Sequence, residues 1–400
     1  MNKRFFLYYF SVIVSNIGNA ATVFVMPLYV LDLTNSVMHL SLVSALQLVP
    51  FLIFGIPFGA IVDRANIKRL MQCCDAIRFI LYLVLAYVTS IGNNIAIIAT
   101  IYICSIISGI CYVFHSISEA TFVPYVVINK DLAKANSLIY AVQYITSFVV
   151  PLIGGRAYSL NTVKYFFAFD AITFLISVLI LGIIKTEDRN EKHIKINLNF
   201  ISLIDDVKAG IKCLNENIFL LKLLVIVALS NFVICSYYNC LLEYLRHGLM
   251  FSSETIGYIE GVYSLGALIG ALSVETLVKK FSKIKIVLIC IGLDAVCRLL
   301  LPHNNAITFI CIMMVIIEFT SAVLNIMVIT IRQESIAPEY LGRLNSVYKT
   351  VLLGINPIGL VIGGVVISKI GAFNHMIVVS VLCSIIFVIA SMLFRERKNK

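Results

Sequence analysis

Long apolar stretches alternate with short polar connections along almost the whole chain, from Phe5 to Phe394. About 20 apolar residues of α-helix are needed to cross the hydrocarbon of a bilayer, so stretches of this length predict membrane spans. A transmembrane β-barrel would instead show segments of about ten residues with alternating polarity, whereas 173–184 and 307–317 are apolar on every face. The pattern predicts an all-α membrane protein with twelve spans, at 5–31, 39–62, 70–91, 95–119, 134–158, 163–184, 218–245, 255–278, 284–301, 305–331, 342–368 and 372–394.

Composition and charge agree with this prediction. Hydrophobic residues make up 60% of the chain and charged residues 13%, whereas about 25% charged residues are usual in a soluble domain. Of the 31 Lys and Arg residues, 24 fall in alternate connections on one predicted side of the membrane, the side that also holds both termini. By the positive-inside rule that side is the cytoplasm. The net charge of +10 therefore reflects topology in a multi-pass protein of the cell membrane, and we expect no nucleic-acid partner.

The N-terminus and the cysteines add no further class of function. The first apolar run is too long for a cleaved signal peptide, so we expect a retained first span. The eleven cysteines lie mostly inside predicted spans and lack the spacing of disulfide or zinc sites. We expect no cofactor and no metal, and we expect the chain to act as a monomer.

The chain shows signs of an internal duplication. Its longest polar segment begins at Lys185 and divides six predicted spans from six. Asn136-Ser137 and Gly154-Gly155 recur as Asn345-Ser346 and Gly363-Gly364, displaced by 209 residues in both cases. Parallel repeats of six spans are found in many secondary transporters. We expect an N-terminal half at 1–184, a cytoplasmic linker at 185–217 and a C-terminal half at 218–400.

The connection after the second predicted span carries a recognisable motif. The run from Gly59 to Arg69, with Asp63-Arg64 and Lys68 inside it, resembles the cytoplasmic signature of the major facilitator superfamily. Asn66 stands where that signature has a second glycine, and we expect it to keep the turn because Asn tolerates a left-handed backbone. The resemblance implies that Asp63, with Arg64 and Lys68 alongside, is a latch of the outward-facing state, and that Gly59 lets another helix approach closely.

A second motif lies in the fifth predicted span. Val150-Pro151-Leu152-Ile153-Gly154-Gly155 is similar to the end of the antiporter motif of exporters in this superfamily. A proline removes one helix hydrogen bond and paired glycines allow close helix crossing, so Pro151, Gly154 and Gly155 are candidates for a pivot. The whole chain resembles the twelve-span exporters grouped with macrolide-efflux proteins and siderophore exporters. The family fold has two pseudo-symmetric six-helix halves.

Charged side chains inside spans are functional candidates because they are costly in a bilayer unless paired or facing water. Glu318 lies near the middle of the tenth predicted span and could bind and release a proton. Asp75 with Arg78, and Asp294 with Arg298, are spaced to pair along one helix face. We see no cluster of His with carboxylates. The proton-coupling candidates are Glu318, Glu260, Asp170 and Asp294.

Uncharged polar and aromatic side chains within spans are candidates for lining a substrate cavity. Aromatic faces with few fixed charges suit large amphipathic or cationic solutes. The same residues could instead merely pack between helices. The candidates are Asn16, Asn19, Tyr140, Gln143, Tyr144, Asn231, Tyr238 and Asn325.

These observations predict a secondary transporter and not an enzyme. No phosphate-binding G-x-x-x-x-G-K-[ST] loop is present in the sequence, so we expect no ATP hydrolysis by the chain itself. The predicted function is proton-coupled efflux of hydrophobic or amphipathic small molecules such as macrolide-type drugs, a multidrug-resistance antiporter. An importer, a siderophore exporter or a lipid flippase on the same scaffold remains an alternative, and a membrane enzyme or receptor is a more distant one.

Overall fold

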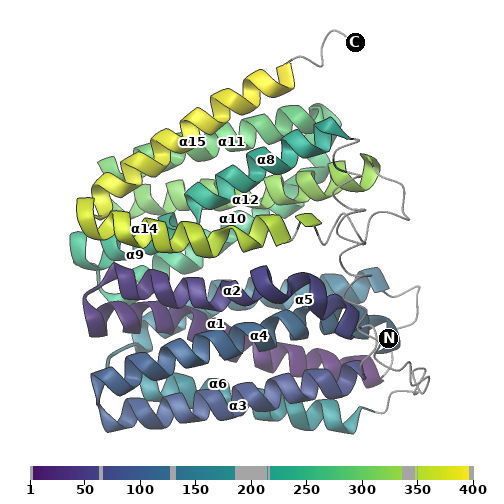
Figure 1. The fold of residues 1–400 in the computed structure, drawn as a ribbon, viewed down its shortest axis with the longest axis vertical. Coiled ribbons are helices and arrows are strands. Elements are labelled where there is room, and N and C mark those ends of the chain that lie inside the picture. Colours follow the sequence, from purple (N-terminus) through teal and green to yellow (C-terminus); the bar gives the residue numbers. More distant parts are fainter. Residues whose placement is uncertain are drawn as a thin grey trace. The chain divides into compact units, whose positions relative to one another are not determined.

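The computed structural model describes residues 3–62, 66–126, 132–184, 214, 217–335, 347–348 and 350–395. These residues form long helices joined by short connections (Figure 1). They divide into two compact units. The first consists of Met1–Thr34 and Leu46–Asp205, and the second of Asn35–Ala45 and Asp206–Lys400.

The first unit is built on a small set of helix contacts. Helix α1 packs against α5 and α6, and α3 packs against α4 and α6. A buried cluster that includes Phe5, Tyr8, Phe122 and Leu181 joins helices far apart in the sequence. The helices are α1 (Lys3–Thr34), α2 (Val37–Val62), which begins in the second unit, α3 (Ile67–Ile91), α4 (Asn94–Val126), α5 (Leu132–Ala157) and α6 (Val163–Ile183).

The second unit contains the remaining helices. The predicted seventh span is interrupted: α8 (Ile218–Ile234) is followed by α9 (Tyr237–Glu243) and the π-helix η2 (Tyr244–Gly248). In the eleventh span α14 begins at Asn356, just before Pro357, after a turn at Ile355. The other elements are α10 (Ser253–Lys280), α11 (Lys283–Leu300), the 3-10 turn η3 (Leu301–His303), α12 (Ile307–Ser335), α14 (Asn356–Ile370) and α15 (Ala372–Arg395).

Two glycines bring α10 and α12 together. A Cβ atom at Gly266 would collide with the Val315 carbonyl, and one at Gly270 would lie 2.8 Å from the Phe319 carbonyl oxygen. Small residues four positions apart let helices approach closely in membranes. Because Phe319 takes part in this contact, its neighbour Glu318 also lies close to α10.

The N-terminal end of α2 belongs to the second unit. There the Asn239 amide donates to the Ser44 hydroxyl at 3.3 Å. A Cβ atom at Gly364 would lie 2.7 Å from the Cβ of Ser41, so α14 and this part of α2 are in tight contact. The residues at the predicted start of the second span therefore belong to the same unit as α14.

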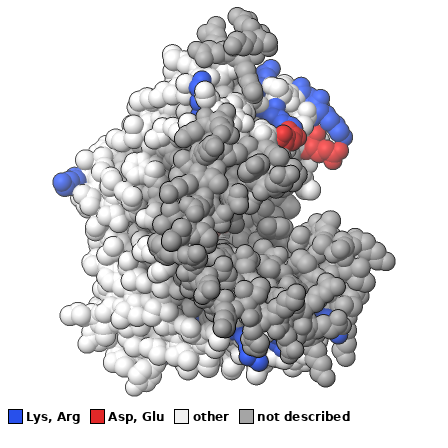
Figure 2. Space-filling model, turned by 45° about the vertical axis from the view of Figure 1, so that its right-hand side comes forward, with Lys and Arg blue, Asp and Glu red and all other residues white. Residues whose placement is uncertain are grey.

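The surface of both units is suited to lipid. Large apolar side chains are exposed on many helices, among them Ile183 at 66% and Leu272 at 74%. Ten helices of the described part are long and apolar enough to cross a membrane. Helix α11 falls outside this group and carries four charged residues, Lys283, Lys285, Asp294 and Arg298. In Figure 2 most of the surface that is not grey is white and so carries no Lys, Arg, Asp or Glu, and blue basic side chains appear in a few places.

The structure corrects the expectation for Asn66. Its backbone is extended, with φ −72° and ψ 102°, and is not left-handed. The side-chain oxygen accepts a hydrogen bond from the backbone N–H of Arg69 at 3.1 Å. Asn66 is thus the N-cap of α3, a role for which Asn is among the preferred residues.

Candidate functional site

A polar recess lies within the second unit between α8, α11, α12 and α15. Its volume is about 90 Å³. Drug-sized ligands occupy pockets of roughly 300–1,000 Å³, so this recess alone has room for a few water molecules and not for such a ligand. Its polar lining is Ser230, Asn231, Asp294, Arg298, Thr320, Ser321 and Asn325.

The recess brings together three residues predicted as candidates, Asn231, Asn325 and Asp294. The Asn231 amide donates to the Leu352 carbonyl at 3.4 Å, and Asn325 is exposed. Asp294 forms the predicted pair with Arg298, with Nε donating at 2.8 Å and Nη2 at 3.0 Å. The guanidinium also lies over the Tyr237 ring at 4.6 Å. Both charges of the pair are buried.

The other two candidate carboxylates of this unit each have a tyrosine partner. The Tyr238 hydroxyl donates to Glu260 Oε1 at 2.6 Å. Glu318 interacts with Tyr263 on α10 and interacts electrostatically with Arg298 and Asp294. Neither glutamate belongs to any of the ion pairs of the described residues. Tyr263 was missed in the sequence because its role depends on a neighbouring helix.

The candidates of the first unit are less clearly grouped. Asp170 is fully buried in α6, where the Thr173 hydroxyl donates to its carboxylate at 3.3 Å. A Cβ atom at Gly18 of α1 would lie 2.5 Å from Asp170 Oδ1, so the two helices are in close contact there. The Asn16 amide donates to the Val12 carbonyl of its own helix at 2.8 Å. Asn19, Gln143 and Tyr144 are half-buried, and the side chain of Tyr140 lies outside the described residues.

The gating candidates near the second connection are mostly outside the described part of the chain. This applies to Asp63, to Arg64 and to the surroundings of Gly59. Lys68 is described, and its ammonium donates to the Gly182 and Ile184 carbonyls at 3.2 and 2.8 Å. A cation at a helix C-terminus stabilises the last carbonyl groups. Lys68 thus ties the start of α3 to the end of α6, and the latch remains a prediction.

The pivot candidates Pro151, Gly154 and Gly155 are all buried in α5. A Cβ atom at Gly154 would lie 3.2 Å from the Phe24 ring of α1, so this glycine faces a close helix contact. The corresponding Gly363 of α14 faces Ser236. Both duplicated glycine pairs therefore include a residue that faces a tight contact.

We expect Gly154→Leu to slow substrate movement more than it weakens substrate binding, because a larger side chain obstructs sliding between α5 and α1. A roughly tenfold slower rate would correspond to about 1.4 kcal/mol in the barrier. The measurement is initial flux in proteoliposomes beside equilibrium binding. Ile153→Leu is the matched control because Ile153 is 66% exposed. Binding and flux lost in equal proportion would indicate a packing defect instead.

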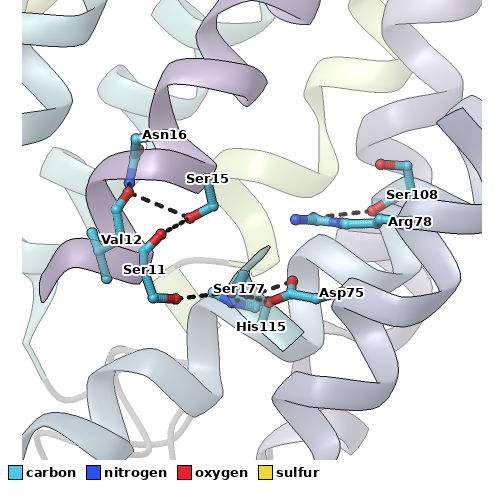
Figure 3. Close-up of polar contacts among 9 residues, drawn as sticks. All are labelled: Ser11, Val12, Ser15, Asn16, Asp75, Arg78, Ser108, His115 and Ser177. Atoms are coloured by element: carbon cyan, nitrogen blue, oxygen red, sulfur yellow. Dashed lines mark hydrogen bonds and ion pairs between the residues drawn. The ribbon is translucent and has the colours of Figure 1, made fainter. Parts of the chain in front are cut away.

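The structure also shows a histidine that the sequence reasoning passed over. His115 Nε2 on α4 lies 3.6 Å from Asp75 Oδ1 on α3 (Figure 3). The prediction that Asp75 pairs with Arg78 was wrong. The Arg78 guanidinium lies instead over the rings of Tyr112 and Phe174, 5.7 and 5.2 Å from their centroids, and its Nη2 donates to the Ser108 carbonyl at 3.4 Å. The available signal in the sequence was that His115 lies four residues before Glu119, a spacing that places both on one face of a helix.

Comparison with known proteins identifies the family. The model of the Major Facilitator Superfamily matches residues 8–237 and again 223–400, which together cover nearly the whole chain. The chain belongs to this superfamily. It is therefore a membrane transporter and not an enzyme, with a twelve-helix fold.

Curated relatives are named as efflux proteins. Macrolide efflux protein A of Streptococcus pyogenes is 24% identical over 97% of this chain and 94% of its own length. The protein of the same name from Enterococcus faecalis is 26% identical over 81% of this chain and 99% of its own.

Solved structures share the fold at lower identity. A mutant of the nucleoside transporter NupG has a TM-score of 0.81 at 12% identity, covering 98% of this chain and 100% of that one. A bacterial homologue of the iron transporter ferroportin has a TM-score of 0.76 at 14% identity, covering 97% and 98%. A D-xylose–proton symporter has a TM-score of 0.72 at 14% identity, covering 99% and 98%.

Proposed function

We propose that this transporter exports hydrophobic or amphipathic small molecules, such as macrolide-type drugs, in exchange for protons. Support for the substrate class comes from the relatives named as macrolide efflux proteins. Support for proton coupling comes from one observation: Glu318 and Glu260 lie in membrane helices, each with a tyrosine partner and neither in an ion pair of the described residues. Within this proposal Glu318 is the essential coupling group.

The tyrosine contacts suit a carboxyl that changes its protonation. A phenolic hydroxyl can donate to a carboxylate and can also accept from a protonated carboxyl group. Neither state then leaves the glutamate without a hydrogen-bonding neighbour. A carboxylate fixed by a guanidinium, as Asp294 is by Arg298, would need a new partner for the arginine before it could take up a proton.

The polar recess has room for a few water molecules. It is lined by Asp294 and Arg298, both of which interact electrostatically with Glu318. Protons move along water and hydroxyl groups, and Thr320 and Ser321 provide such groups at the recess. We propose that protons reach Glu318 by this route, while the substrate occupies a larger space than the recess.

The proposal includes the topology. Both termini lie in the cytoplasm, residues 1–184 and 218–400 form the two six-helix halves, and 185–217 is a cytoplasmic linker. We propose that the monomer in the cell membrane is the transporting unit. Asp63 acts as the cytoplasmic latch with Arg64, and Asn16, Asn19, Gln143, Tyr144 and Tyr140 line the substrate space from the first half.

Inverted membrane vesicles test the function directly. Their interior corresponds to the cell exterior, so an acid interior should drive a labelled macrolide into vesicles that contain the transporter, and a protonophore should release it. Vesicles without the protein are the control. Loss of macrolide from acid-loaded vesicles would indicate an importer, and uptake that ignores the pH gradient would refute proton coupling.

A further inference from the structure

A chain of polar contacts crosses four helices inside the first unit (Figure 3). The hydroxyl oxygens of Ser11 on α1 and Ser177 on α6 are 2.9 Å apart. The Ser177 hydroxyl donates to Asp75 Oδ2 on α3 at 2.7 Å. On its other side, Asp75 Oδ1 faces His115 Nε2 on α4 at 3.6 Å. The sequence places none of these residues close together.

Asp75 and His115 differ in their exposure to solvent. The Asp75 side chain is 1% exposed, whereas the His115 side chain is 17% exposed. A buried carboxylate costs several kcal/mol unless a counter-charge or several hydrogen bonds compensate it. Asp75 has one hydrogen bond, from Ser177, and Oδ1 accepts none among the described residues. A proton on His115 would give that oxygen a cationic neighbour.

The surrounding charges also favour a protonated His115. Glu119 lies one turn further along α4, and Asp75, Glu119 and Arg78 are the charged groups that act on His115. Among these three groups two carboxylates face one guanidinium, so within this set a neutral ring leaves one negative charge uncompensated and a protonated ring balances it. Arg78 lies over two aromatic rings. The other titratable groups near these side chains come from all four helices. They are Tyr8 from α1, Cys74 and Tyr82 from α3, Cys111 and Tyr112 from α4, and Asp170 from α6, which interacts with Arg78.

We propose that Asp75 and His115 form a proton-binding site of the first unit, distinct from the glutamate–tyrosine pairs of the second. The bound proton ties α4 to α3 and, through Ser177 and Ser11, α3 to α6 and α1. Release of the proton from the accessible ring removes the ion pair and loosens this tie. Only the link from this site to transport rests on the proposed function; the site itself does not.

Histidine NMR on the purified full-length transporter in lipid nanodiscs tests the site. The chain has six histidines, and the signal lost in His115→Gln assigns the ring. At neutral pH, ring nitrogen shifts should show a charged His115 in the wild type. Asp75→Asn, which keeps the shape of the side chain, should lower the ratio of charged to neutral ring at least roughly tenfold, equivalent to about 1.4 kcal/mol. A neutral wild-type ring, or a charge that ignores Asp75→Asn, overturns the proposal.

His375 serves as the internal control. It is buried in α15, and its Nε2 lies 2.9 Å from the Ser236 hydroxyl, with no carboxylate paired to it among the described residues. Its signal should be unchanged by Asp75→Asn. Because this experiment needs neither substrate nor flux, it decides the site even if Glu318 proves irrelevant.

A transport measurement then tests the link to function. Downhill substrate movement is recorded in proteoliposomes at a series of pH values equal on both sides, with no gradient imposed. The rate should depend less on pH in His115→Gln than in the wild type. An unchanged pH profile in His115→Gln would contradict the proposed role of the site in transport.

Discussion

Glu318→Gln should abolish substrate accumulation driven by a pH gradient while substrate still moves down its own gradient. Glutamine resembles the protonated carboxyl group in shape and charge and can keep its contact with Tyr263. The two halves can then exchange between states without carrying a proton. A gradient of one pH unit supplies about 1.4 kcal/mol per proton, enough for a roughly tenfold concentration ratio, which the variant should lose.

The measurement is the steady-state ratio of labelled substrate inside and outside proteoliposomes with an acid interior, beside the initial rate of downhill flux. Tyr263→Phe removes the hydroxyl that faces the carboxylate and should weaken accumulation only partly. Glu254→Gln is a matched control because Glu254 is exposed in the first turn of α10. Full accumulation by Glu318→Gln would exclude this residue as the essential coupling group and direct attention to Glu260, Asp170 or Asp294.

The sequence was sufficient to predict the class of fold, because the apolar stretches needed to cross a bilayer are visible without any tertiary contact. The family match and the solved relatives confirm the superfamily and the twelve-helix fold. Helix breaks were less predictable. The π-helix after α9 and the turn at Ile355 lie inside apolar stretches that read as continuous spans.

The candidate site was predictable only where both partners share one helix. Asp294 and Arg298 are four residues apart, and they pair as predicted. Asp75 and Arg78 are three residues apart and were expected to pair in the same way. Instead the carboxylate lies beside His115 on α4, and the guanidinium lies over aromatic rings. The contact between Tyr238 and Glu260 spans two helices in the same way. Such choices depend on how helices pack, which spacing along one helix does not encode.

Arg298→Met should be the most destabilising of the single substitutions considered for the second unit. Arg298 makes two hydrogen bonds to Asp294, and both side chains are buried. Removing one partner of a buried pair leaves an uncompensated charge and typically costs 3–5 kcal/mol, on the order of a third or more of a typical domain's stability. The Arg298 side chain also stacks on Tyr237, and methionine keeps only part of that contact. We expect a clear drop in the melting temperature of the detergent-solubilised protein.

The double variant Asp294→Asn with Arg298→Met should recover much of this loss, because no buried charge is left unpaired. The exposed pair of Lys279 and Glu275 provides the control, since it has the same spacing of four residues but side chains 71% and 80% exposed. Lys279→Met should change the free energy of unfolding by less than about 1 kcal/mol. If Arg298→Met alone is as stable as the wild type, Asp294 must become neutral without its partner. It would then be able to take up a proton in the membrane, and a coupling role for Asp294 would gain support over a purely structural one.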